Sequence, residues 1–126
     1  MGLALLNQGR WNAAYYLMGY AVECSLKACI VNYVSQHLEV IFSERNFFRD
    51  CWTHDFEMLL KISQLDGVLN NAIQFDAQLG QNWGTATQWE EISRYRLSKN
   101  QVEAMELFNA ITDPQHGVLP WIKQHW

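Results

Sequence analysis

The clearest pattern in the chain is a long, almost uncharged helix in its first third. Between residues 13 and 34 only Glu23 and Lys27 carry charge, and nearly every other residue is apolar, aromatic or glycine. At the helical period Glu23 and Lys27 share one face with Tyr16 and Tyr20, while apolar side chains cover almost all of the remaining circumference. A helix of this kind must be covered on more than one side. It therefore lies at the centre of a bundle or meets a second subunit.

Shorter helices follow this long one, which we expect to span about residues 10–36. Residues 37–49 mix apolar and charged side chains and fit either a helical extension or an ordered loop. Thr53 is a suitable N-cap for a helix whose first turn holds His54 and Asp55. The remaining expectations are a helix that begins near Leu65–Gly67, a loop over Gly80–Ala86, capping boxes at Thr87/Glu90 and Ser98/Gln101, and a last segment that begins at Asp113–Pro114.

These elements predict an all-α protein, a four- to five-helix up-and-down bundle that forms one domain over residues 1–126. The chain is 49% hydrophobic and 13% aromatic, which excludes disorder. We also expect a homodimer, because one small bundle cannot cover the apolar circumference of the long helix. Part of that helix and the C-terminal run WIKQHW are the expected interface.

Charge and cysteine content narrow the function further. A net charge of −4 argues against a general nucleic-acid binder, although Arg94, Arg96 and Lys99 form a local basic cluster. The three cysteines show no CxxC or zinc spacing, and two of them lie in the apolar helix, so buried reduced thiols are expected. With no signal peptide and no uncharged run long enough to span a bilayer, we expect a cytoplasmic protein without a membrane partner.

The run GYAVECSLKA (residues 19–28), followed after a loop by His54-Asp55, resembles the HEPN domain family of prokaryotic helical bundles. The resemblance extends more weakly to Trp89 with Arg94-Tyr95 and to residues 117–123. That family includes ribonuclease toxins, non-catalytic partners of small nucleotidyltransferases, and domains of unknown role. The resemblance thus implies a helical bundle in a toxin–antitoxin-like system.

The ribonucleases of the family share an Arg-x4–6-His motif near the start of a late helix, in which Arg stabilises the charged transition state and His moves the proton of the 2′-hydroxyl. The matching stretch here, residues 94–100, contains no histidine. We therefore expect a non-catalytic binding module that recognises a nucleotide or RNA phosphate, pairs with a nucleotidyltransferase, or does both. The alternative is a metal-independent ribonuclease that uses a displaced pair, Arg49 and His54. A purely structural dimerisation domain is the third hypothesis.

Two interpretations stay open for the residues expected to bind ligand. Glu23 and Lys27 form either a solvated i,i+4 pair or part of a buried network with His54, Arg94 or Arg96. His54-Asp55 either caps a helix or places an anion site at its N-terminus. No histidine spacing fits a metal, and no cofactor motif is present. The candidate ligand-binding residues are Tyr20, Glu23, Lys27, His54, Asp55, Arg94 and Arg96.

Overall fold

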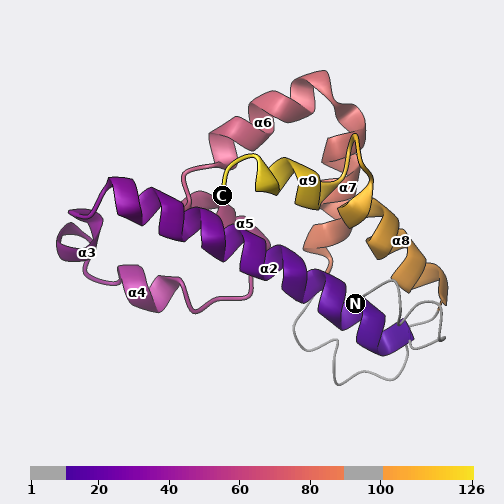
Figure 1. Cartoon of the computed structure of the whole chain (residues 1–126), viewed down its shortest axis with the longest axis horizontal. Coiled ribbons are helices and arrows are strands. Elements are labelled where there is room, and N and C mark those ends of the chain that lie inside the picture. The colour runs from indigo at the N-terminus through magenta and orange to yellow at the C-terminus, as the bar shows by residue number, and fades with distance from the viewer. Residues whose placement is uncertain (1–10, 90–100) are drawn as a thin grey trace.

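A computed structural model describes residues 11–89 and 101–126, and within these ranges the fold is entirely helical, as predicted (Figure 1). Eight helices are described rather than four or five, because the chain between the long helices breaks into pieces of one to three turns. In chain order they are α2 (Trp11–Gln36), α3 (Val40–Ser43), α4 (Phe47–Asp50), α5 (Phe56–Ile62), α6 (Asp66–Phe75), α7 (Ala77–Thr87), α8 (Gln101–Thr112) and α9 (Val118–Lys123).

Helix α2 runs the length of the molecule, and α5, α8 and α9 all pack against it (Figure 1). One side of α2 is fully buried, with Ala14, Val22 and Leu26 inaccessible to solvent. The partners come from distant parts of the sequence, and α7 joins them by packing on α8 and α9. Three helices therefore pack against α2, while its other side, which includes Ala21, Cys24 and Val31, stays exposed.

The C-terminal segment lies along α2 of its own chain. The Cys29 thiol approaches the Ile122 carbonyl at 3.8 Å, and the Asn32 side chain donates a hydrogen bond of 3.2 Å to the His125 carbonyl. Trp121 and Ile122 are buried in the core. Trp121 and Ile122 of the WIKQHW run thus pack within their own bundle, whereas Lys123, Gln124 and Trp126 are exposed.

Several helix boundaries differ from the sequence prediction. Asp55, not Thr53, caps α5, and the Thr53 hydroxyl instead accepts a hydrogen bond from the Asp55 amide. Residues 80–86, expected to be a loop, lie inside α7, because the helix tolerates both Gly80 and Gly84 once its apolar side is packed. Thr87 is the last residue of α7, and Glu90 and Ser98, the other members of the expected capping boxes, lie outside the described residues.

The segment at Asp113–Pro114 forms a turn, and α9 begins only at Val118. The Asp113 carboxylate accepts hydrogen bonds from the amides of Gln115 and His116, so it closes this turn instead of capping a helix. In the parts of the chain that the structure describes, no helix combines the length and the apolar character needed to cross a lipid bilayer.

Gly19 allows a tryptophan to lie directly against α2. A Cβ atom at this position would overlap the indole ring of Trp89. That ring stacks on Phe56 of α5, with centroids 5.3 Å apart and an interplanar angle of 7°. Trp89 therefore joins α2 to α5, and it reaches α2 only because residue 19 has no side chain.

We predict that Gly19→Ala lowers the free energy of unfolding by about 1–3 kcal/mol, since the buried indole cannot move without losing its stacking on Phe56. The matched control is Gly84→Ala in α7, where a Cβ atom meets nothing within 4 Å. It should raise the free energy of unfolding by up to about 1 kcal/mol through helix propensity alone. Urea denaturation measures both, and equal stabilisation by the two substitutions would contradict this account of Gly19.

Candidate functional site: a buried carboxylate that holds a lysine and a histidine

Glu23 is the only charged side chain that is buried among the described residues, with 2% of its surface exposed. It lies in the middle of α2, on the side that faces the start of α5. A buried carboxylate is strongly unfavourable unless charged or polar groups satisfy both oxygens. The structure supplies one partner for each oxygen.

The first partner is His54, whose Nδ1 lies 2.7 Å from Oε1 of Glu23. His54 belongs to the segment between α4 and α5, and three hydrogen bonds around it fix this segment. The Thr53 hydroxyl accepts a hydrogen bond from the Asp55 amide, and Asp55 Oδ1 accepts hydrogen bonds from the amides of Glu57 and Met58. The imidazole is therefore held by its own carboxylate contact and by a fixed backbone.

The second partner is Lys27, one turn further along α2, whose ammonium group lies 3.1 Å from Oε2 of Glu23. The side chains of Lys27 and His54 are both partly exposed, whereas Glu23 is not. Glu23 thus holds a lysine and a histidine at the surface, and we call these three residues the Glu23 triad. This arrangement agrees with the buried-network interpretation and rules out a solvated Glu23–Lys27 pair.

Tyr20 lies beside the triad on the same helix. It is 45% exposed and stacks on Tyr16, with centroids 6.1 Å apart. Its neighbour Cys24 and, more weakly, Glu23 raise the pKa of the Tyr20 hydroxyl. The phenol is therefore protonated at neutral pH and can donate a hydrogen bond next to the triad.

Asp55 caps helix α5, which favours the helix-cap interpretation of His54-Asp55 over the anion-site interpretation. The amides at the start of α5 that an anion would need already donate to the Asp55 carboxylate. A second negative group at the same place would meet this carboxylate directly. The N-terminus of α5 is therefore not an anion site.

Of the arginines expected near this site, the structure describes Arg49, which does not join the triad. Arg49 is exposed on α4 and makes no hydrogen bond or ion pair within the described residues. Arg94 and Arg96 lie outside those residues. The triad thus consists of Glu23, Lys27 and His54, with Tyr20 next to it.

A second polar cluster, which the sequence did not reveal, fastens α9 to the junction between α6 and α7. The Nδ1 of His116, in the turn before α9, lies 2.8 Å from the Asp76 carboxylate. Asp76 also caps α7 through the Leu79 amide, and the buried Asn82 donates to the His116 carbonyl at 2.8 Å. The bond to Asp76 raises the pKa of His116, and the same bond lowers the pKa of Asp76.

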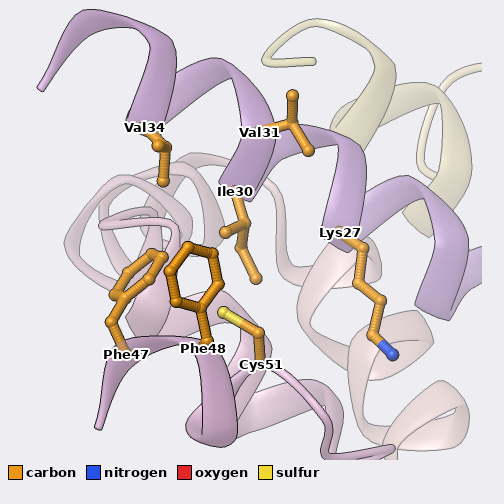
Figure 2. A pocket seen from close by; sticks show the side chains of 7 residues that line it. All are labelled: Lys27, Ile30, Val31, Val34, Phe47, Phe48 and Cys51. Atoms are coloured by element: carbon orange, nitrogen blue, oxygen red, sulfur yellow. The ribbon is translucent and has the colours of Figure 1, made fainter. Parts of the chain in front are cut away.

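An apolar pocket of about 260 Å³ opens between the C-terminal half of α2 and helix α4 (Figure 2). Helix α4 forms the second wall of the pocket and lies largely in residues 37–49, for which the sequence allowed either a helix or an ordered loop. Lys27 lines one side of the pocket, so the pocket adjoins the triad. The lining residues are Lys27, Ile30, Val31, Val34, Phe47, Phe48 and Cys51.

The cysteines are all free, but only Cys29 is buried, so the expectation of buried thiols fails for Cys24, which is exposed on α2. Burial raises the pKa of the Cys29 thiol to about 11. Burial and the nearby Asp50 also raise the pKa of the Cys51 thiol, although Lys27 acts in the opposite direction. In the part of the chain that the structure describes, no group of three or more His, Cys, Asp or Glu side chains could hold a metal ion.

Comparison with models of known protein families, with curated proteins and with solved structures found no match to this chain. The resemblance to HEPN domains therefore rests only on the residues quoted for it.

We predict that His116→Gln reduces thermal stability most between about pH 4 and pH 6.5. His116 has a raised pKa in the folded protein, so its contribution is complete below its unfolded pKa and is lost as the pH rises through the folded value. Asp76 has a lowered pKa, so its contribution is present above its unfolded pKa and is lost as the pH falls through the folded value. Melting temperatures of both proteins from pH 3 to pH 9 measure the difference.

The matched control is His37→Gln, because the Nδ1 of His37 meets a backbone carbonyl, that of Tyr33, instead of a carboxylate. Its effect on the melting temperature should vary much less with pH. An effect of His116→Gln that is constant across the whole pH range would show that the ion pair with Asp76 does not stabilise the fold.

Proposed function

We propose that the protein is a non-catalytic binding module that recognises the phosphate of a nucleotide or RNA at the Glu23 triad. The observation that supports this most is the buried carboxylate that holds Lys27 and His54 side by side at the surface. Lysine ammonium and protonated imidazole both bind phosphate oxygens through charge-assisted hydrogen bonds. Because Glu23 fixes both groups, less side-chain entropy is lost when an anion binds.

Two further features fit the same proposal. The Tyr20 hydroxyl lies next to the triad and stays protonated, so it can donate to a third phosphate oxygen. Arg94 and Arg96 supply additional positive charge in the sequence. By resemblance to HEPN domains, the protein partner of such a module is a small nucleotidyltransferase.

The alternative is a metal-independent ribonuclease with Arg49 and His54 as its catalytic pair, and one observation favours it. A buried carboxylate that accepts a hydrogen bond from Nδ1 fixes the tautomer and orientation of an imidazole, which a general base requires. Arg49, however, makes no hydrogen bond or ion pair with Glu23 or His54 in the described part of the chain. The binding module is therefore the preferred proposal.

We predict that the protein binds 5′-AMP and a short single-stranded RNA, and that Lys27→Gln weakens both by about tenfold, or about 1.4 kcal/mol. The substitution removes the ammonium group but keeps a polar side chain of similar length. Lys61→Gln, at an exposed lysine in the last turn of α5, is the matched control and should leave affinity unchanged. Isothermal titration at two salt concentrations measures these affinities.

The same samples are then incubated with RNA in the presence of EDTA. Intact RNA is the expected result. Cleavage that disappears in His54→Ala would overturn the non-catalytic proposal in favour of the ribonuclease. Equal affinities of the wild type, Lys27→Gln and Lys61→Gln would show that the triad is not the phosphate site.

We also propose that two copies of the chain pair through the exposed face of α2. Ala21, Cys24 and Val31 lie on this face, and Val31 is 68% exposed. The exposed and half-exposed residues 17, 21, 24, 28 and 31 follow alternating steps of four and three, carry no charge, and match the seam that one helix presents to another. A second copy fits this face, because an identical uncharged seam is self-complementary about a two-fold axis.

We predict that light scattering gives twice the chain mass of 14.7 kDa, and that Ala21→Glu halves it by placing two charges in the seam. Ala77→Glu introduces the same charge at an exposed alanine of α7 and should leave the dimer intact. Mild oxidation should link the wild-type chains through Cys24, and Cys24→Ser should abolish the link. A wild-type protein that is monomeric at high micromolar concentration would refute this dimer.

A further inference from the structure

The apolar pocket between α2 and α4 has walls of one chemical kind. Ile30 and Val34 come from α2, while Phe47 and Phe48 come from α4, and nearly all the surface they expose to the pocket is carbon (Figure 2). Phe47 is buried in the core, whereas Phe48 is 61% exposed at the open side of the pocket. The two rings meet edge to face, with centroids 6.1 Å apart.

A cationic group lies just outside one end of the pocket. Figure 2 shows the Lys27 side chain at the side opposite the phenyl rings, with its nitrogen at the point furthest from them. The aliphatic stem of Lys27 belongs to the lining, and its ammonium group is held by Glu23. The pocket is thus apolar throughout, with one cationic group just beyond its rim.

This pairing selects the chemistry of an occupant. A nucleobase would bury several hydrogen-bonding groups against walls that offer no polar partner, which is unfavourable. An apolar chain or ring loses no hydrogen bonds when it enters the pocket. A single anionic group at its end can then form an ion pair with the ammonium group of Lys27. The volume of the pocket limits the size of the ligand. A protein cavity of about 150 Å³ accommodates benzene, so a pocket of about 260 Å³ holds about ten carbons.

We propose that this pocket binds an amphipathic monocarboxylate whose apolar body has about ten carbons and whose carboxylate meets the ammonium group of Lys27. The site is separate from the phosphate site in its ligand and in its walls, and it shares only Lys27 with the triad. Cys51 lies in the wall between Phe48 and Lys27 (Figure 2). A bound ligand therefore covers the Cys51 thiol.

Decanoate, at concentrations below micelle formation, tests the proposal, with decanol as the uncharged comparison of equal chain length. Alkylation of Cys51 by N-ethylmaleimide is followed by mass spectrometry in a Cys24→Ser background, in which the buried Cys29 serves as an internal reference. We expect decanoate to slow the alkylation of Cys51 by about tenfold at saturation. We expect decanol to bind at least several-fold more weakly in titration.

Two variants locate the effect. Lys27→Gln should make the affinities for decanoate and decanol equal, whereas Lys61→Gln should keep them different. Val34→Trp should fill the pocket and abolish protection of Cys51, with circular dichroism to confirm that the variant is folded. The comparison of decanoate with decanol on the wild type tests the charged end even where a variant does not fold.

No protection of Cys51 by decanoate would overturn the proposal, and so would equal affinity of the wild type for decanoate and decanol. Protection that persists in folded Val34→Trp would place the ligand elsewhere and overturn it too. The test is independent of the phosphate proposal, because Val34→Trp leaves the triad intact and should bind 5′-AMP as the wild type does.

Discussion

The fold depends on covering α2. With 26 residues this helix is about 39 Å long, and it is apolar around most of its circumference. Helices α5, α8 and α9, drawn from three separate parts of the sequence, each bury a portion of it. The short helices α3 and α4 extend over its C-terminal half without filling the space beneath them, and the apolar pocket results. The uncovered residues form one uncharged face, so α2 accounts for the core, the pocket and the proposed dimer seam.

The burial of Glu23 imposes a second constraint on the same helix. A carboxylate inside the contact between α2 and the start of α5 is tolerated because each of its oxygens has its own partner. One partner is local, four residues away on α2, and the other comes from a segment thirty-one residues later. The distant partner ties the segment before α5 to the middle of α2, and the local partner carries the charge out to the rim of the pocket. The triad therefore links two parts of the fold and also holds two basic side chains, Lys27 and His54, at the surface.

Much of the architecture was predictable from periodicity, and most of the site was not. The bounds of α2 and its central position follow from a strong local pattern, whereas the expected loop over residues 80–86 is helical because packing of Leu79, Asn82 and Trp83 outweighs two weak helix formers. The sequence left the state of Glu23 open, because burial depends on which helix packs against it. No local signal joins His116 to Asp76 across forty residues, and none reveals a pocket that arises from incomplete cover by α4.

The geometry of the triad also restricts the order in which its residues can change during evolution. Loss of Glu23 leaves Lys27 and His54 partly exposed, where water can solvate both of them. Loss of Lys27 and His54 together leaves a buried carboxylate without partners, which costs several kilocalories per mole. Lineages that drift away from the triad must therefore give up the acid before both bases. Sequences that keep the lysine and histidine without the glutamate should therefore be more stable than those that keep the glutamate alone.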